Sequence, residues 1–246
     1  MVEKFALEEF LDSARVHDGV FALRPDYRAL LVAVDGLEPG PGDDASEALL
    51  QQAEAIARQA LRERPVDQLP HIAAWREAYR AFGAKPQRTR NSVEALTRRV
   101  EGGLPRVNRI TDLYNAVSVM HQLPVGGEDL SRYCGAPQLI RATGEESFDT
   151  TADGVTVTEH PDVGEVVWCD DTGVTCRRWN WRQARRTQLS EETTSALFIM
   201  DALDPLTDDQ LCAAAEDLTS HLRRLGPDVH TAQRLLQNHP ETKSGD

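Results

Sequence analysis

The chain of 246 residues carries a net charge of −13, with 40% hydrophobic and 6% aromatic residues, a composition typical of a globular protein that can bury a sizeable core. It contains no apolar run of about 18 residues or more, which argues against a transmembrane helix and a membrane partner. The first residues, MVEKFALEEF, are too acidic for a secretory leader, so a cytoplasmic location is expected.

The cysteines and histidines show no spacing typical of a metal site. Cys134, Cys169, Cys176 and Cys212 form no CxxC pair. Cys169 and Cys176 flank the turn-like segment DDTGVT and could face each other across a hairpin, although reduced thiols are expected in a cytoplasmic chain. The seven histidines show neither HxxxH nor HExxH spacing. Neither a metal nor a cofactor is therefore expected.

The amino-terminal half predicts one strand followed by helices. Alternating Leu30, Val32 and Val34 predict a strand within residues 21–37. Caps, apolar spacing and chain breakers then predict helices at residues 44–64, capped by Asp44 or Ser46, at residues 72–83, stopped by Gly83, and after Asn91 as far as Gly102.

The stretch NRITDLYNAVSVMHQLPVGGEDL, residues 108–130, predicts a helix that ends abruptly. Its apolar face is marked by Ile110, Leu113, Tyr114, Val117 and His121. A proline and two glycines follow. This pattern is either a simple helix stop or one wall of a binding site.

The remaining sequence is rich in predicted strands. The separation of helical and strand-rich parts favours an α+β fold over a doubly wound sheet. The expected organisation is one α+β domain over residues 1–205, with residues 206–246 forming a helix and a frayed tail packed on it. The predicted strands are residues 139–142, 147–150, 155–160, 165–170, 174–181 and 194–202, with a hairpin turn at 171–173 and a final helix from Thr207 to about Gly226.

Two basic islands interrupt this acidic chain. Residues 76–109 contain nine basic and three acidic residues, and residues 177–186 contain five arginines and no acid. RNA binding is compatible with these islands, because it depends on the local potential as well as on net charge. Acidic residues elsewhere could equally neutralise these arginines in the folded protein.

Three segments in this order resemble one family: AWREAYRAFGAKPQRTRNSVEAL, VNRITDLYNAVSVMHQLPVGGEDL and VVWCDDTGVTCRRWNWRQARRTQLSEETT. They resemble the free-standing relatives of the editing module of bacterial phenylalanyl-tRNA synthetase, which the fused third and fourth B-domains of the beta subunit form. The resemblance covers roughly residues 20–205. It implies a β-rich core with helices packed around it. In the synthetase, this module hydrolyses the ester of wrongly charged tyrosyl-tRNA.

The resemblance carries over to individual residues only in part. Asn115 matches the asparagine of the family motif, whereas Tyr114 replaces a threonine. Gly126 stands where the synthetase module has its editing-site histidine. The late acidic residue of the module corresponds to a place near Ile199, two residues before Asp201.

The chemistry implied by the resemblance needs no protein nucleophile, because an aminoacyl ester is already activated. A positioned water, donors to the developing oxyanion and a contact to the α-ammonium group suffice. Gly126 and Gly127 would let backbone N–H groups approach a ligand. Glu128 or Asp129 could bind the α-ammonium or orient water, and Asn115 could hold the carbonyl. The expected catalytic set is therefore Asn115, Gly126, Gly127 and Glu128; otherwise the glycines stop a helix and the acids are solvated surface.

The segment RRWNWRQARR supplies the other expected contacts. Strand alternation predicts Arg178 and Asn180 on one face, with Trp179 and Trp181 on the other, either in the core or stacked on the terminal adenine. The expected substrate-binding residues are Tyr114, Asp129, Arg141, Glu145, Arg178 and Asn180, although Arg141 and Glu145 could be an ordinary surface ion pair. The expected RNA-binding residues are Lys85, Arg88, Arg90, Arg185 and Arg186.

Three hypotheses follow for function. In the first, a stand-alone protein binds the aminoacylated 3′ end of tRNA and hydrolyses the ester of a mischarged tRNA in trans. In the second, a binding module that has lost the hydrolytic residues binds RNA or an amino-acid-like ligand. In the third, the same scaffold carries an unrelated small-molecule enzyme. Aminoacylation itself is not expected, because the sequence contains no ATP-binding motif.

Overall fold

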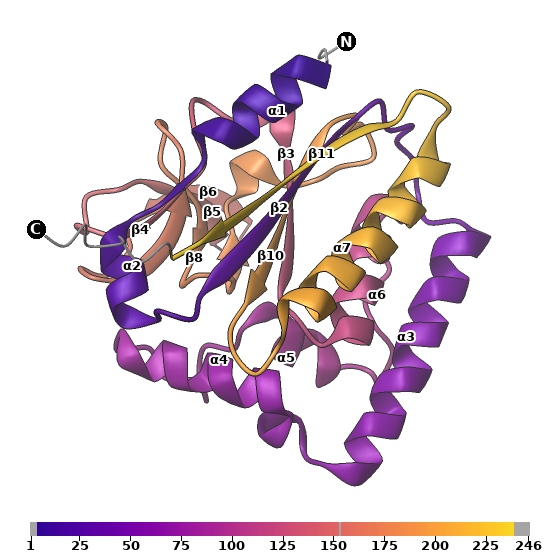
Figure 1. Cartoon of the computed structure of the whole chain (residues 1–246), viewed down its shortest axis with the longest axis horizontal. Coiled ribbons are helices and arrows are strands. Elements are labelled where there is room, and N and C mark those ends of the chain that lie inside the picture. The colour runs from indigo at the N-terminus through magenta and orange to yellow at the C-terminus, as the bar shows by residue number, and fades with distance from the viewer. Residues whose placement is uncertain (1–3, 153, 239–246) are drawn as a thin grey trace, which may run out of the picture.

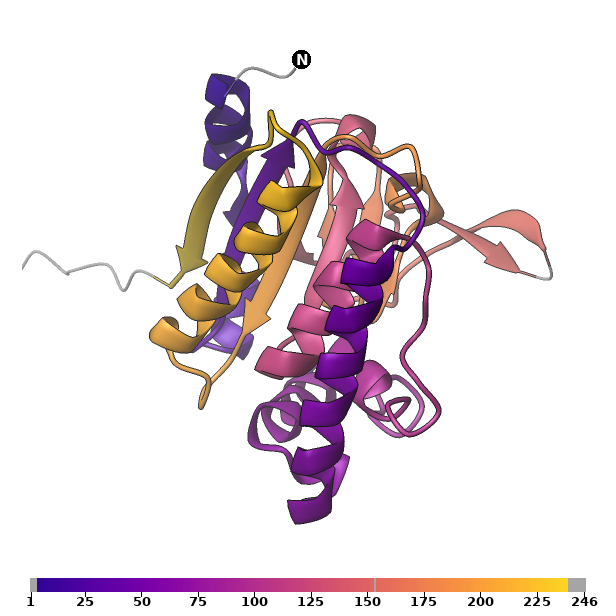
Figure 2. The same cartoon turned by 90° about the vertical axis from the view of Figure 1, so that its right-hand side faces the viewer.

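The computed structural model describes residues 4–152 and 154–238, which form three layers (Figure 1). An antiparallel four-stranded sheet lies in the middle, helices cover one of its faces, and a second, five-stranded sheet lies on the other (Figure 2). The predicted α+β class, with a strand-rich core and helices packed around it, is confirmed. Within the described residues, no helix is both long and apolar enough to cross a membrane.

The central sheet has the strand order β11-β2-β10-β3. Seven of the eight residues of β2 are buried, because both faces of this strand are covered. Its alternation sends Leu30, Val32 and Val34 toward the helices, and Leu31 and Ala33 toward the second sheet. The four strands are β2 (Arg28–Asp35), β3 (Val125–Asp129), β10 (Ala196–Ala202) and β11 (His230–Gln237).

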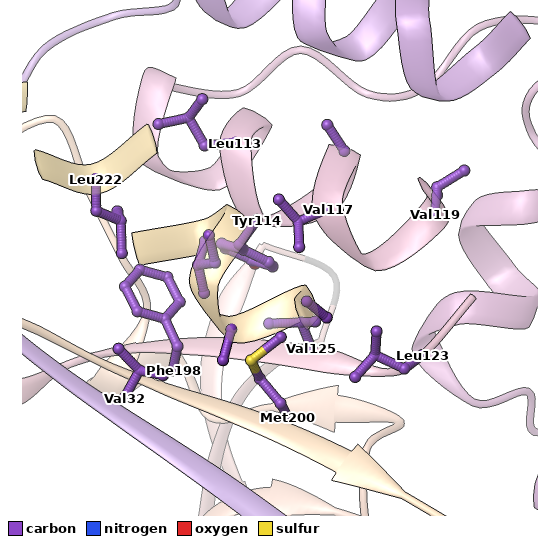
Figure 3. Packing of buried hydrophobic residues seen from close by; sticks show 14 of the residues in the cluster. Val32, Leu113, Tyr114, Val117, Val119, Leu123, Val125, Phe198, Met200 and Leu222 are labelled. Carbon is purple, nitrogen blue, oxygen red and sulfur yellow. The ribbon is translucent and has the colours of Figure 1, made fainter. Parts of the chain in front are cut away.

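Three helices form the layer on one face of this sheet. The side chains of Leu113 and Val117 lie above Phe198 and Met200 of β10 (Figure 3). Capping side chains fix where each helix begins, because they accept hydrogen bonds from backbone N–H groups of the first turn. The helices and their caps are α3 (Asp44–Glu63) with Asp43, α6 (Arg109–His121) with Asn108, and α7 (Asp208–Leu222) with Thr207.

The second sheet closes a separate core with the opposite face of β2 and β10. Trp75, Trp168 and Trp179 are fully buried in this core. Helices α1 (Lys4–Ser13) and α4 (Pro70–Ala81) also contribute side chains to it. The strands of this sheet, in spatial order, are β1 (Arg15–Val16), β4 (Gln138–Arg141), β7 (Val166–Cys169), β8 (Val174–Arg177) and β9 (Arg182–Gln183).

A two-stranded hairpin projects away from these layers (Figure 2). It consists of β5 (Phe148–Ala152) and β6 (Val155–Glu159). The remaining elements are short: α2 (Asp18–Leu23), α5 (Ser92–Thr97), and single 3₁₀ turns at Val66–Gln68, Leu130–Arg132, Arg185–Thr187 and Arg223–Leu225.

Two sequence predictions about the strands were wrong at their ends. The strand expected at 21–37 begins only at Arg28, because the preceding segment forms α2. The strand expected at 174–181 ends at Arg177, because Arg178 and Trp179 adopt positive φ angles of 48° and 70° that turn the chain.

The N-cap of α3 was also predicted wrongly. It is Asp43 rather than Asp44 or Ser46, although Ser46 completes the capping box.

Two strands of the central sheet were not predicted. Residues after Pro124 were interpreted as a helix stop or pocket wall, whereas Val125–Asp129 form the edge strand β3. The chain beyond α7 was expected to be a tail, whereas His230–Gln237 pair with β2 along their whole length. Most of the expected frayed tail, residues 239–246, lies outside the described residues.

Candidate functional site

A cavity of about 210 Å³ lies between the two sheets, beside the edge strand β3. Helices α5 and α6 supply one wall, and the turn that follows β8 supplies another. Its lining combines apolar and aromatic side chains with a few polar groups, as small-molecule sites usually do. The lining residues are Ser92, Ala95, Leu96, Arg99, Tyr114, Asn115, Val125, Gly126, Glu128, Trp168, Cys176, Trp179, Asn180, Trp181, Gln183, Ile199 and Asp201.

The register of β3 and β10 puts two carboxyl side chains on the same face of the central sheet. Glu128 lies opposite Leu197, and Gly126 lies opposite Ile199. Directly paired residues project to the same side, and alternate residues of β10 share that side. Asp201 therefore faces the second sheet together with Glu128, and both line the cavity.

The two glycines of β3 have different roles. A Cβ atom on Gly126 would come no closer than 3.5 Å to Nε2 of Gln183, so the space beside Gly126 belongs to the cavity. Gly127 faces the helix layer, where a Cβ atom would lie 2.8 Å from side-chain atoms of Tyr114 and Leu189. Gln183 donates a hydrogen bond of 2.8 Å to the backbone carbonyl of Gly127. Gly126 thus leaves room for a ligand, whereas Gly127 leaves room for Tyr114.

Asp201 sits in a hydrogen-bonded network at the buried end of the cavity. Tyr27 Oη donates to Oδ1 of Asp201 at 2.6 Å, and Asn180 Nδ2 donates to Oδ2 at 3.1 Å. Tyr79 Oη donates in turn to Oδ1 of Asn180 at 2.9 Å. Burial nevertheless raises the pKa of Asp201 to about 7, and the nearby Glu128 acts in the same direction.

Glu128 is the second buried carboxyl of the cavity, and its side chain accepts a hydrogen bond from Tyr133 Oη. Burial raises the pKa of Glu128 to about 7. A carboxyl with such a pKa exchanges its proton near neutral pH, which suits a general base. Cys176 also lines the cavity. Desolvation, reinforced by the charges of Glu128 and Asp201, raises the pKa of its buried thiol well above the usual range. Cys176 is therefore unsuited to act as a thiolate nucleophile.

Three indole rings form the aromatic wall. Trp179 packs edge-on against Tyr27 and Trp75, with ring centroids 5.0 and 5.2 Å apart. Trp168 lies on β7 and is 1% exposed, whereas Trp181 is half-buried. Because the chain turns at Trp179, Trp179, Asn180 and Trp181 all line the cavity, and the predicted separation onto two strand faces was wrong.

The basic residue of the cavity lining, Arg99, follows directly after α5 and its C-cap. Arg99 is exposed, and no described carboxylate lies within ion-pair distance of it. Ser92 and Ala95 lie on α5 and are half-buried. This arrangement leaves a positive charge on the solvent side of a cavity whose inner end is acidic.

The structure brings together Tyr114, Asn115, Gly126, Glu128 and Asn180 from the predicted site. The other predicted residues are held elsewhere. Asp129 accepts hydrogen bonds from the backbone and hydroxyl of Ser131 and from Thr193. Arg141 donates a hydrogen bond to the Gly164 carbonyl, and Glu145 is exposed. Arg178 donates a hydrogen bond to Thr89 and forms ion pairs with Asp162 and Glu165.

The basic islands are largely neutralised by acids, which favours the second of the two interpretations of their charge. Lys85, Arg88 and Arg99 differ, because all three are exposed and no described carboxylate lies within ion-pair distance of any of them. Lys85 and Arg88 line a second hollow together with Arg178 and its ion-pair partners Asp162 and Glu165. The paired arginines are Arg76 with Glu94, Arg106 with Glu47 and Glu54, Arg177 with Glu159 and Glu165, Arg182 with Glu159, and Arg186 with Asp170, while Arg90 and Arg185 lie 3.9 and 3.6 Å from Glu94 and Asp149.

Sequence reasoning missed several lining residues, above all Asp201 and Gln183. Asp201 was noted only as lying two residues beyond a motif position. Its signal was available, because strand alternation places Asp201 on the same face as Ile199. Gln183 and Arg99 had no such signal, because their positions depend on the turn after β8 and on the packing of α5.

The described residues thus combine an α+β fold with an acidic, aromatic cavity at the edge of the central sheet. Residues 74–226 match the family described as the B3/4 domain, and the chain belongs to this family. The family match confirms the resemblance that the three sequence segments carry.

A solved structure and the curated proteins complete the comparison. The chain is similar to an N-terminal fragment of the phenylalanyl-tRNA synthetase beta-subunit from Pyrococcus horikoshii, with 10% identity and a TM-score of 0.47. The similarity covers 92% of this chain and 54% of that one, so the chain spans about half the length of the fragment. No curated protein matches the chain.

Proposed function

We propose that this B3/4-family protein hydrolyses the ester of a mischarged aminoacyl-tRNA in trans at the cavity beside β3. The observation that carries the proposal is that Asn115, Gly126 and Glu128, which were assigned to catalysis from one stretch of the sequence, line one cavity. The aminoacyl group would enter this cavity, and the terminal ribose would remain on the side of the exposed Arg99.

The chemistry needs only a water and a base. The carboxylate of Glu128 would take a proton from the water as its oxygen attacks the ester carbonyl carbon. The tetrahedral oxyanion then collapses, the bond to the ribose oxygen breaks, and the proton passes to that oxygen. The amide of Asn115 is a donor that can stabilise the oxyanion. A pKa near 7 keeps a large fraction of Glu128 ionised at neutral pH.

The tRNA body would contact the protein outside the cavity. Lys85 and Arg88 are exposed, have no described carboxylate within ion-pair distance, and are therefore available to phosphate groups. Phosphate contacts of this kind position a nucleic acid without reading its sequence. The expected partner is therefore tRNA bound through its backbone and its aminoacylated end.

A second candidate function follows from Gly126, which stands where the synthetase module has a histidine. In this alternative the cavity binds an aminoacyl end or a free amino-acid-like ligand without hydrolysing it. Incubating the protein with charged tRNAs separates the two. Accelerated loss of the ester supports the hydrolase, whereas protection of the ester with retained tRNA binding supports the binding module.

A further inference from the structure

The buried end of the cavity is acidic and aromatic. Asp201 is 2% exposed and Glu128 is 1% exposed, and both line the cavity. Among the described lining residues, the only basic side chain is that of Arg99, which is exposed. The lining thus places no buried cation beside these carboxyl groups, and a cation outside the lining, Arg186, acts on Glu128.

Desolvation makes this arrangement unfavourable when both carboxyls are ionised. The raised pKa values of Asp201 and Glu128 reflect that cost. A ligand cation would remove it, because an opposite charge favours ionised carboxyls. Asp201 can accept a further hydrogen bond, since a carboxylate accepts about four, Tyr27 and Asn180 supply two, and the Trp168 side chain is the one further donor that lowers its pKa.

The aromatic walls favour the same kind of ligand. The faces of indole rings attract cations, and tryptophan does so most strongly. Trp168, Trp179 and Trp181 all line the cavity together with Asp201. Indoles beside a carboxylate make a suitable environment for an alkylammonium group, since the rings pack on its methylenes while the carboxylate binds its nitrogen.

The spacing along the sheet fits a long side chain. Glu128 pairs with Leu197, and Asp201 lies four residues further along β10. The Cα atoms of Leu197 and Asp201 are therefore roughly 13 Å apart. Gly126 lies between the two carboxyl residues and leaves the middle of this span open. With the reacting ester near Glu128, an extended side chain running over Gly126 would end close to Asp201.

We infer that the cavity selects an aminoacyl group whose side chain ends in a cation, of the lysine or ornithine class, with Asp201 binding that cation between the indole rings. The inference rests on the proposed function for the placement of the ester. It adds a substrate class and makes Asp201 the specificity residue, with Trp168 and Trp179 as walls that exclude water.

A pair of ligands tests the inference without requiring hydrolysis. Adenosine carrying a lysyl group through a 3′-amide is stable, and its norleucyl counterpart lacks only the terminal ammonium. Calorimetric titration of the wild-type protein should give at least about tenfold tighter binding of the lysyl compound, the usual effect of a charge-assisted hydrogen bond. Equal binding, tighter binding of the norleucyl compound, or no binding of either overturns the inference.

Two matched variants assign the effect. Asp201→Asn should bring the lysyl affinity to that of the norleucyl compound, while Asp129→Asn, which changes a carboxyl outside the cavity lining, should retain the preference. A preference unchanged in Asp201→Asn contradicts the role of Asp201. Melting curves confirm that the variants are folded, and the wild-type comparison remains decisive if Asp201→Asn does not fold.

Hydrolysis assays separate this inference from the proposed function. If lysyl-tRNA and norleucyl-tRNA are hydrolysed at equal rates, the proposed function stands and the substrate class fails. If neither is hydrolysed but the lysyl analogue binds more tightly, the substrate class stands and the hydrolytic function fails.

Discussion

Gly126 of β3 and Ile199 of β10 are direct antiparallel partners, and together they form the part of the cavity wall that lies between Glu128 and Asp201. The absence of a side chain at Gly126 keeps this part open. The neighbouring Gly127 has the opposite orientation, so adjacent glycines provide matched tests of function and of packing.

The first prediction compares these glycines. Gly126→Ala should leave the melting temperature unchanged or slightly higher, because its Cβ meets nothing closer than 3.5 Å. Gly127→Ala should destabilise the protein by about 1–3 kcal/mol, because its Cβ would lie 2.8 Å from Tyr114 and Leu189. Thermal unfolding measures both. Equal destabilisation by the two variants would contradict the orientation of β3.

The larger variant Gly126→Val extends this comparison to function. Its side chain would project into the cavity, and it should lower deacylation about tenfold or more because a misplaced substrate loses the benefit of orientation. Gly126→Ala serves as the smaller control. Full activity in the valine variant would show that substrate does not pass over Gly126.

The second prediction concerns Glu128→Gln, which keeps the size of the side chain and removes its charge. If Glu128 acts in the transition state, the loss of a charge-assisted contact of about 1.5–3 kcal/mol lowers the rate roughly 10- to 150-fold. Single-turnover deacylation measures this rate. The matched control is Asp129→Asn, since Asp129 is bonded to Ser131 and Thr193 outside the cavity lining. A rate reduced in the control and unchanged in Glu128→Gln would move the role to Asp129.

Most regular elements were predictable from the sequence because their signals are local. Apolar spacing and caps located α3, α4, α6 and α7 to within a few residues. The edge strand β3 gave no such signal: it contains Gly126 and Gly127, which are unfavourable in strands, and β10 holds it in place. The strand β11 likewise depends on pairing with β2. Local propensity does not report pairing between segments that are distant in sequence.

The residues of the candidate site were predictable where they belong to one motif. Residues that reach the site only through long-range packing were not predictable. Asn115, Gly126 and Glu128 belong to one continuous stretch, so they were found together. Arg178 was misplaced because a positive φ angle, unusual for arginine, turns the chain away from the expected strand. Asp201 joins the site only through the register of β10 against β3.

The third prediction uses the pH dependence of stability. The folded-state pKa of Glu128, about 7, lies above its ordinary value of 4.5. The stability that the neutral carboxyl contributes is therefore complete below about pH 4.5 and is lost as the pH rises through 7. Glu128→Gln avoids ionisation, so its stability relative to wild type should increase between pH 5 and pH 8 by up to about 3 kcal/mol. Denaturant unfolding at the two pH values measures the change; a constant difference would contradict the raised pKa.

The fourth prediction concerns RNA. Replacing Lys85 and Arg88 with alanine should weaken binding to every tRNA alike and reduce the salt dependence of binding. A variant that makes fewer phosphate contacts releases fewer counterions when it binds. The control replaces Arg62 and Arg64, two exposed residues at the end of α3, with alanine. Filter binding over a series of salt concentrations measures both. An unchanged affinity in the Lys85 and Arg88 variant, or an equal loss in the control, would contradict the assignment of this surface.

The central claim is that the cavity beside β3 hydrolyses an aminoacyl ester. Its most direct test is to incubate the purified protein with a panel of correctly and wrongly charged tRNAs and to follow the ester-linked amino acid over time, beside Glu128→Gln and a sample without protein. We expect the wild-type protein to remove the amino acid from at least one charged tRNA faster than spontaneous hydrolysis does, and Glu128→Gln to abolish most of this acceleration. Spontaneous rates across the whole panel, with folded protein and retained tRNA binding, would contradict it.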